Sequence, residues 1–258
     1  MKNQALPQSN LYGYFRRTNR PMLKRIYQVI SGFLIVWCSS CATISYTPAV
    51  SLDISPRTIR KTVQIDKFTD STSQRDRKNG FGKFAVTNDK SLIGGLDLEV
   101  TKAITYDFST NAVFKEAGRR VENPDFYLRG TIRRYKGITS MNQYTKTSYI
   151  LFCSGLLIGP IAPVFYLGLI PYATILCGVP ANKTQSEVEI EIQLLDNHKV
   201  VVSRYTAKAE NHFSSSAYRN TTTQLPNFTN KVLTEVVAKL RAQLLAEADK
   251  LEAIHSEN

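Results

Sequence analysis

The sequence is poor in the side chains that most enzymes use for chemistry. It has only three histidines, which lie in a turn, in a polar segment and near the chain end: His198, His212 and His255. No serine or cysteine lies in a known nucleophile motif, no glycine-rich loop is suited to a phosphate, and no Cys/His spacing resembles a metal site. We therefore expect a protein that is not an enzyme and that has no metal or other non-covalent cofactor.

One apolar run near the amino terminus has the order of a secretory signal. Met22–Arg25 supplies a basic start, Ile26–Trp37 is mostly apolar, and small residues then lead to Cys41. This order is typical of exported proteins, whose signal is removed. Either Met1 or Met22 could be the start; a signal of ordinary length begins at Met22 and makes Met1–Pro21 an upstream extension.

The end of this segment, Cys38-Ser39-Ser40-Cys41, resembles the lipobox of bacterial lipoproteins. Ser39 and Ser40 are small, as the signal peptidase of that family requires, whereas Cys38 stands where the family most often has Leu. The resemblance implies cleavage between Ser40 and Cys41, a diacylglycerol on the Cys41 thiol and an acyl chain such as palmitate on the new amino terminus. It also implies a place in the cell envelope, where Ala42 after the lipidated cysteine favours the periplasmic face of the outer membrane.

Two other interpretations of the apolar run compete with a lipoprotein signal. An uncleaved membrane anchor needs about 20 apolar residues, and Ile26–Leu52 is long enough only if polar Ser, Thr and Gln are included. A buried core segment would fit the length of Ile26–Trp37, but not the basic residues ahead of it: Arg16, Arg17, Arg20, Lys24 and Arg25. Only the lipoprotein explains the order basic, apolar, small, cysteine.

The chain without its signal would be moderately basic. Residues 1–40 contain six of the 33 Lys and Arg residues and none of the 21 acidic ones, so their removal lowers the formal net charge from +12 to +6. Such a charge suits contact with anionic lipid headgroups or cell-wall polymer. We expect the membrane and an envelope protein or a second copy of this chain as partners, and no nucleic acid.

A cell-wall or envelope hydrolase with an unrecognised carboxylate site is the alternative function. Asp66 and Asp70 flank Phe68, and Asp76 follows nearby. Carboxylates of this kind are mostly exposed and solvated, so the pattern by itself does not favour catalysis.

The remaining chain predicts a tether followed by one domain. Residues 41–58 are polar, contain Pro48 and Pro56, and read as a lipidated tether. The domain, residues 59–255, opens with a strand around Val63 and Ile65. Residues 69–90 then read as a long polar loop, and a helix is predicted where apolar residues recur every fourth position: Leu96, Val100, Ile104 and Phe108.

Asp125–Tyr135 predicts a second strand with two different faces. One face is apolar or small: Phe126, Leu128, Gly130 and Ile132. The other is basic and aromatic and could contact an anionic polymer or lipid phosphate: Arg129, Arg133 and Tyr135. The ordinary alternative is a solvated face, or arginine stems packed under a helix.

Two more strands and a helix complete the pattern. Val188–Leu194 and Val200–Ala207 flank the turn 196–199 and read as a β-hairpin. A final helix is expected from Asn227, as its N-cap, to about Ala253. The fold class is α+β (mixed α/β): one sheet of about four strands and two or more helices, in the order β-α-β-(apolar insertion)-β-β-α.

This pattern is similar to the small α/β domain of several envelope lipoproteins. They are the amino-terminal domain of the Tol-Pal β-propeller protein, the lipoprotein activators of penicillin-binding proteins and the curli secretion lipoprotein. The likeness rests on Val63–Asp70, Asp125–Ile132 and Val188–Asp196. It implies a binding or scaffold component of a cell-envelope assembly; the insertion described next departs from the first two, so no partner is carried over.

No charged residue occurs between Lys146 and Lys183. Prolines at 160, 163 and 171 interrupt the centre of this run, Tyr149–Pro180, and disfavour one straight transmembrane helix. Tyr149–Gly159 would span about 16 Å as a helix, half of a hydrocarbon core. We expect a helical hairpin that contacts membrane or a partner through Leu151, Phe152, Leu156, Leu157, Ile158, Phe165, Leu167, Leu169 and Ile170.

Three interpretations of this insertion remain open. It could dip into the leaflet that holds the Cys41 lipid, form an apolar surface for a partner or an oligomer with close approach at Gly155–Gly159, or fold back as core of its own domain. If two limbs run antiparallel about Pro160–Pro163, Cys153 and Cys177 both fall near their base. A disulfide is then allowed in an exported protein, and packed free thiols are the alternative.

Overall fold

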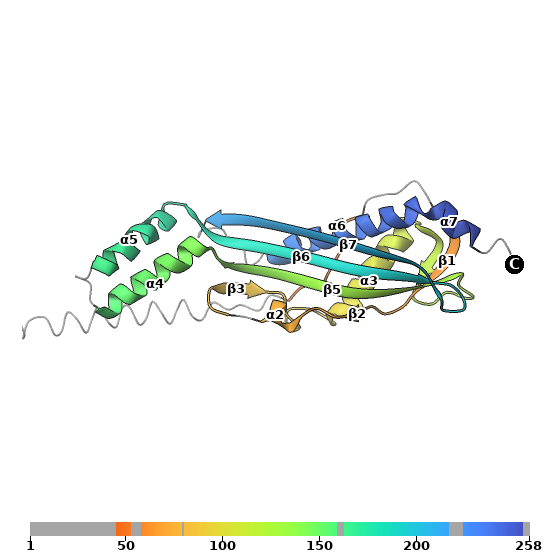
Figure 1. Cartoon of the computed structure of the whole chain (residues 1–258), viewed down its shortest axis with the longest axis horizontal. Helices are drawn as coiled ribbons and strands as arrows, with labels where there is room; N and C mark the ends of the chain where they lie inside the picture. Colours follow the sequence, from red (N-terminus) through yellow and green to blue (C-terminus); the bar gives the residue numbers. More distant parts are fainter. Residues whose placement is uncertain (1–44, 53–57, 79, 159–162, 217–223, 255–258) are drawn as a thin grey trace, which may run out of the picture. The chain divides into compact units, whose positions relative to one another are not determined.

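The computed structural model describes residues 45–52, 58–78, 80–158, 163–216 and 224–254 (Figure 1). All of these residues belong to one compact unit, Thr43–Asn258. The predicted signal, the lipidation site Cys41, Pro160 and His255 lie outside the described residues.

A mixed sheet of seven strands forms the centre of this unit. β5 is parallel to β1 and antiparallel to β6, and the strand order is β4-β1-β5-β6-β7, with β2 and β3 also paired to β5. The three longest strands have 16 residues each: β5 (Phe126–Met141), β6 (Pro180–Leu195) and β7 (Val201–Ser216). The others are β1 (Ile59–Ile65), β2 (Thr69–Asp70), β3 (Lys83–Val86) and β4 (Phe114–Gly118).

The mixed α+β class is confirmed, but four strands was an undercount. β2, β3 and β4 have two, four and five residues, too few for a period-2 pattern to stand out. β2 and β3, with the short helix α2 (Gln74–Arg77), occupy the segment that was expected to be one polar loop. The β6–β7 hairpin is longer than predicted, because β7 continues to Ser216.

Both predicted helices form; the first starts at Leu96 as its pattern indicated, and the last starts earlier than expected. α3 (Leu96–Thr110) follows Gly94 and Gly95. Both glycines have positive φ angles, 90° and 89°, which are not helical, so the helix begins only after them. The last helix divides at Glu247 into α6 (Leu225–Ala246) and α7 (Ala248–Ala253). Asn227 was wrong as the N-cap, because the N-cap is Gln224, three residues earlier, and Pro226 lies in the first turn of the helix, where a missing N–H costs little.

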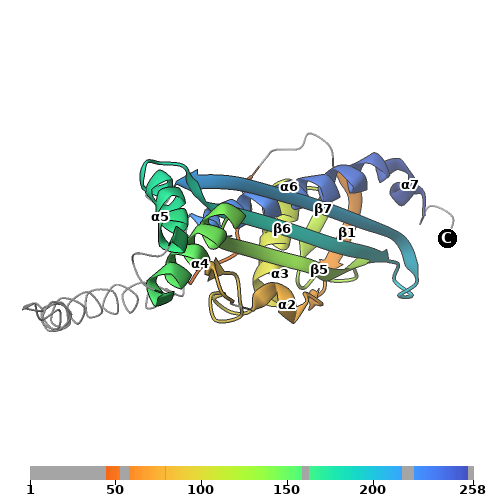
Figure 2. The ribbon, with the colours of Figure 1, turned by 60° about the vertical axis from the view of Figure 1, so that its left-hand side comes forward.

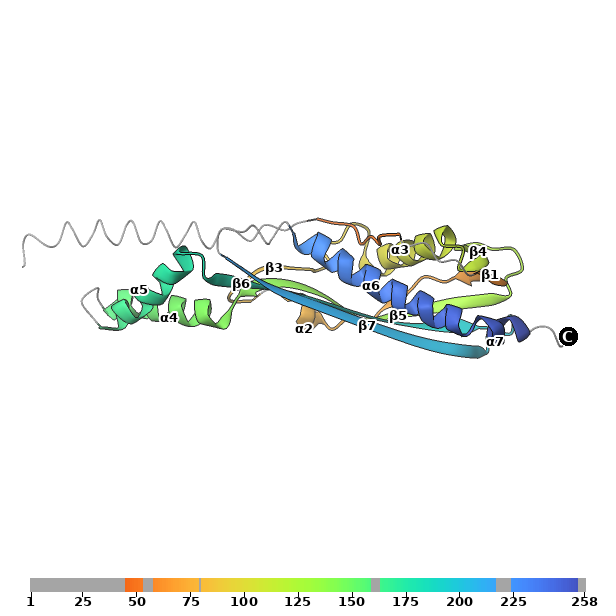
Figure 3. The same ribbon diagram turned by 90° about the horizontal axis from the view of Figure 1, so that it is seen from above.

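The hydrophobic core lies between one face of the sheet and the helices α3 and α6. Figure 3 shows both helices on one side of the sheet and α2 on the other. Even-numbered residues of β6 and the first half of β5 face these helices, as the alternation predicted. The fully buried side chains include Phe126, Leu128, Ile132, Ile190, Ile192, Val236 and Leu240.

A β-bulge at Ile132–Arg134 changes which face the second half of β5 presents. The register with β6 shifts there, so the buried positions change from even to odd numbers. Tyr135 is therefore 1% exposed in the core, and its predicted place on the basic face was wrong. Its hydroxyl accepts a hydrogen bond from the Tyr46 hydroxyl at 3.3 Å, and burial is the main cause that raises the pKa of both tyrosines.

The segment expected to be a free tether is partly docked on the domain. Tyr46 is 8% exposed, and its backbone N–H donates to the Ser91 carbonyl at 2.8 Å. The backbone N–H groups of Ala49 and Ser51 donate to Asn230 and Thr234 on α6. The domain thus begins at about residue 45 rather than 59, because a buried aromatic ring holds this stretch in place.

Candidate functional site: the apolar helical hairpin

Two helices join the ends of β5 and β6 and continue beyond the sheet: α4 (Gln143–Ile158) and α5 (Pro163–Leu176) (Figures 1 and 2). α4 starts six residues before the expected limb because Asn142 caps it. The Asn142 side-chain oxygen accepts from the Thr145 N–H at 2.7 Å, and its own backbone N–H donates to Ala181 at 2.9 Å. The hairpin is therefore tied to the strand pair at its base.

The two helices pack antiparallel, as predicted. Tyr144 and Thr174 share a hydrogen bond of 2.8 Å near the base, and Gly168 lies against the backbone of Phe152 further out. A Cβ at Gly168 would approach that backbone more closely than 3.0 Å. The close contact between α4 and α5 thus uses Gly168. Pro171 was expected to break the second limb, but α5 continues through it.

The outward side of the hairpin is apolar and exposed. Exposed fractions reach 52% for Ile150, 60% for Leu167 and 67% for Ile170, and Leu169 is also exposed. Leu151 and Phe152 are half-buried, while the side chains of Leu156, Leu157, Ile158 and Phe165 are outside the described set. Within the described residues, the core cluster of the domain contains no member of α4 or α5. Contiguous exposed apolar surface of this kind marks a contact site for a membrane or a partner.

Cys153 and Cys177 are free thiols in the structure, which is the second of the two alternatives left open by the sequence. The reason is helix register. Position 144 lies beside 174, and position 152 beside 168, so Cys153 lies opposite about position 166, roughly 11 residues or about 16 Å along the hairpin from Cys177. A disulfide needs Cα atoms within about 7 Å.

A loop from the other side of β5 supports the base of α4. The ring of Phe81, which is 66% exposed, lies 6.0 Å from the ring of Tyr149. Gly82 has a φ of 75°, and a Cβ there would lie 2.9 Å from Cε of Lys146. The lysine stem therefore packs over this glycine.

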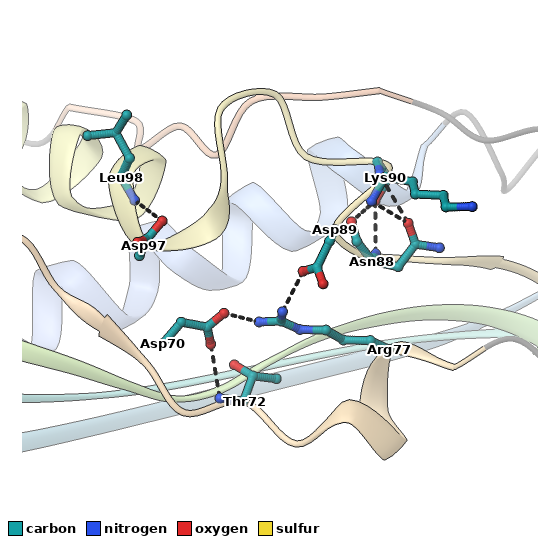
Figure 4. Close-up of polar contacts among 9 residues, drawn as sticks. Asp70, Thr72, Arg77, Asn88, Asp89, Lys90, Asp97 and Leu98 are labelled. Carbon is teal, nitrogen blue, oxygen red and sulfur yellow. Dashed lines mark hydrogen bonds and ion pairs between the residues drawn. The ribbon is translucent and has the colours of Figure 1, made fainter.

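Arg77 holds that loop in place. Figure 4 shows its guanidinium between the carboxylates of Asp70 and Asp89, so one cation joins β2, α2 and the turn after β3. Asp70 also accepts from the Thr72 N–H at 2.9 Å. Asp76 contacts Arg134 at 3.5 Å. Two of the three carboxylates considered for a hydrolase are thus engaged in ion pairs from different elements.

The sheet face opposite α3 and α6 is a network of paired charges. Arg133 donates to Glu191 at 2.7 Å, and Arg134 donates to Glu187 at 2.8 Å. Lys208 lies 2.9 Å from Glu187, and Arg204 lies 3.4 Å from Glu191. The basic face of β5 is therefore largely neutralised by the acidic face of β6; an anionic contact at exposed Arg129 stays a prediction.

These pairs change the acidity of the two glutamates. Burial of the Glu187 carboxylate pushes its pKa up, but hydrogen bonds and positive charge from Lys208 and Arg134 outweigh burial and leave the pKa below its ordinary value. The hydrogen bond from Arg133 is the main cause that lowers the pKa of Glu191. Both carboxylates are charged and paired at neutral pH.

Among the described residues, no group of three or more His, Cys, Asp or Glu side chains is placed to hold a metal ion. His198 lies in the β6–β7 turn and His212 on β7. In the part of the chain that the structure covers, no helix is both long and apolar enough to span a membrane.

Three lysines lie at the base of the hairpin, and the sequence pattern did not single them out as functional residues. Lys83 on β3 and Lys183 on β6 both pair in register with Ser140 on β5, and Lys146 lies one turn into α4. The sequence feature that could have revealed these lysines is that Lys146 and Lys183 are the two charged residues on either side of the uncharged run.

No protein-family model and no curated protein matches the sequence. Solved structures show partial likeness. A Xanthomonas campestris protein of the family DUF330 has 13% identity and a TM-score of 0.47, covering 81% of this chain and 98% of its own. The minor lipoprotein of Acinetobacter baumannii has 10% identity and a TM-score of 0.37, covering 74% and 95%.

The PelC dodecamer of Paraburkholderia phytofirmans has 9% identity and a TM-score of 0.30, covering 73% of this chain and 93% of its own. All three TM-scores lie below 0.5, so these likenesses determine neither a family nor a function for the chain.

Proposed function

We propose that this chain is a lipid-anchored cell-envelope protein, a non-enzymatic binding or scaffold component whose α4–α5 hairpin enters the lipid leaflet. The observation that carries this proposal is the exposed, uncharged surface of the hairpin beyond the end of the sheet. Water contact with Leu167 and Ile170, each at least 60% exposed, is unfavourable in proportion to the apolar area. Insertion in lipid removes that cost.

The dimensions of the hairpin suit one leaflet. Helices of 16 and 14 residues are about 24 and 21 Å long, too short to cross the roughly 30 Å of a hydrocarbon core. The part of α4 beyond Ser148, Tyr149–Ile158, spans about 15 Å, the depth of one leaflet. Tyr144 lies at the base, 44% exposed, with its hydroxyl hydrogen-bonded to Thr174. Tyrosines with an apolar ring and a polar end are enriched at membrane–water interfaces.

A lipid on Cys41 would bring the domain to the same membrane. Five residue steps separate Cys41 from docked Tyr46, and an extended chain of that length spans at most about 18 Å. The diacylglycerol and the amino-terminal acyl chain would together anchor the chain stably, and an inserted hairpin would add a second contact with the same membrane. We place the protein on the periplasmic face of the outer membrane, following the expectation from Ala42.

Metabolic labelling with a fatty-acid probe tests the anchor. The wild type should be labelled, Cys41→Ser should not, and Cys38→Ser should still be labelled because its thiol lies before the proposed cut. Normal labelling of Cys41→Ser would refute the proposal that the chain is a lipoprotein anchored at Cys41.

A tryptophan reporter tests the hairpin. The only tryptophan of the chain is Trp37, in the predicted signal, so Ile170→Trp in a Trp37→Phe background gives a single reporter. In vesicles that contain the lipidated protein, brominated lipid should quench this fluorescence. Val200→Trp is the control, because Val200 is 60% exposed beside the β6–β7 turn and should not be quenched. An unquenched reporter at position 170 would instead indicate a protein partner for the hairpin.

A further inference from the structure

Four residues form a row across the sheet at the base of the hairpin. Lys83 on β3 pairs with Ser140 on β5, Ser140 pairs with Lys183 on β6, and Lys183 pairs with Ser214 on β7. Residues directly opposite one another in antiparallel strands point to the same face, so ammonium and hydroxyl groups alternate along this row. Neighbouring strands lie about 4.8 Å apart, which places the two lysines about 10 Å from each other at their backbones.

Lys146 adds a third cation beside this row. Its stem packs over Gly82, the residue before Lys83. Lys83 bends so that its Nζ donates to the Lys78 carbonyl at 2.6 Å, which holds its charge at the β3 edge. We call Lys83, Lys146 and Lys183 the lysine collar.

The collar differs from Arg133, Arg134 and Lys208 on the same sheet face, because no acidic partner among the described residues neutralises it, a property that it shares with Arg129 and Lys136. Arg133, Arg134 and Lys208 are all paired with glutamates. For the three collar lysines, no carboxylate lies within ion-pair distance in the described parts of the chain. The nearest glutamate along β6, Glu187, already has two basic partners.

We propose that the lysine collar binds the phosphates of anionic lipid headgroups and so sets how deeply the hairpin enters the leaflet. This inference rests on the proposed function, since it assigns the collar to the boundary of the inserted hairpin. The three cations lie where uncharged helix gives way to sheet, the level at which phosphates lie when the apolar helices are in hydrocarbon. Lysines near an anionic surface each strengthen binding about fivefold, and lysine stems are long enough to reach headgroups from a helix end.

The serines of the row complement the cations. Ser140 and Ser214 hydroxyls can each donate a hydrogen bond to a phosphate oxygen, and the ammonium groups add charge-assisted bonds. Exposed Phe81 beside Tyr149 supplies aromatic surface at the same level. The chemistry of this boundary therefore matches an anionic phosphodiester over a neutral zwitterionic headgroup.

The test uses the lipidated protein with the Ile170→Trp reporter in the Trp37→Phe background. It is reconstituted in vesicles of phosphatidylcholine alone or of phosphatidylcholine mixed with phosphatidylglycerol, and quenching by brominated lipid is measured against salt. Phosphatidylglycerol should increase quenching at low salt, and high salt should remove the increase because exposed charges are screened. With Lys83→Gln, Lys146→Gln and Lys183→Gln combined, phosphatidylglycerol should have no effect, whereas quenching in phosphatidylcholine should remain.

The matched control removes three exposed lysines at the opposite end of the sheet: Lys115→Gln, Lys199→Gln and Lys250→Gln. It should keep the full response to phosphatidylglycerol. A collar variant that responds like the wild type would overturn the lysine collar while leaving hairpin insertion intact. A wild-type reporter that no vesicle quenches would overturn hairpin insertion itself, and the collar with it.

Discussion

Gly130 lies in the middle of β5, where the ring of Phe68 occupies the space that a side chain would need. A Cβ at position 130 would lie closer than 3.0 Å to three ring carbons. Phe68 is 2% exposed, and its backbone N–H donates to the Thr101 hydroxyl at 3.0 Å. The ring therefore has little freedom to move away.

We expect Gly130→Ala to lower the free energy of unfolding by about 1–3 kcal/mol, the usual cost of overpacking a core. Urea unfolding followed by circular dichroism measures the change. Gly80→Ala is the control, since a Cβ there has nothing within 4 Å, and it should leave the midpoint unchanged. Equal stability of Gly130→Ala and the wild type would mean that Phe68 does not pack as described.

At the scale of elements, the hairpin continues the chain from the end of β5 to the start of β6, and its other contact with the domain described above is that of Tyr149 and Lys146 with the loop at Phe81 and Gly82. Met141 pairs with Asn182, and Asn142 donates to Ala181, so the two strands meet before α4 begins. A short turn could therefore replace the whole hairpin. The boundaries for such a deletion are Gln143 and Val179, because a cut at Tyr149 would leave the first turns of α4.

Deleting Gln143–Val179 and joining the ends with a short Gly/Ser turn should leave a cooperatively unfolding domain with little change in its urea midpoint. The reason is that the core cluster in the described residues contains no side chain of α4 or α5. Circular dichroism during urea unfolding is the measurement. Failure of the deleted chain to fold would show that the hairpin is part of the core.

At the scale of the whole molecule, the paired charges across β5, β6 and β7 predict a dependence of stability on pH. The pKa values of Glu187 and Glu191 are lowered in the folded state. A lowered carboxylate pKa contributes stability above the unfolded pKa, about 4.3 for Glu, and the contribution is lost as pH falls through the folded pKa. These two groups should therefore destabilise the protein in acid and have no effect of this kind between neutral pH and about pH 5.

Urea midpoints measured from neutral pH down to about pH 3 test this. The wild type should lose stability below about pH 4, and Glu187→Gln with Glu191→Gln should lose less over that interval while being less stable at neutral pH. Glu235→Gln is a control, because Glu235 is an exposed helix residue paired only with Lys239 among the described residues. If the urea midpoint of the double variant falls with pH as much as that of the wild type, carboxylates other than Glu187 and Glu191 dominate acid unfolding.

Local patterns of the sequence by themselves determined several elements. The spacing of Leu96, Val100, Ile104 and Phe108 determined one face of α3, and the alternation around Ile190 and Ile192 determined the buried face of β6, because both patterns depend only on near neighbours. The uncharged run between Lys146 and Lys183 and its central prolines likewise predicted a helical hairpin, but left open whether that hairpin joins the core.

Only the tertiary structure decided what those elements present to their surroundings. The bulge at Ile132–Arg134 moved Tyr135 into the core, and register brought Glu191 to Arg133 across 58 residues of chain. Register also aligned Lys83 and Lys183 on either side of Ser140, whereas helix pairing kept Cys153 from Cys177. Each outcome depends on which residue of a distant segment lies opposite, and a shift of one position would reverse every face.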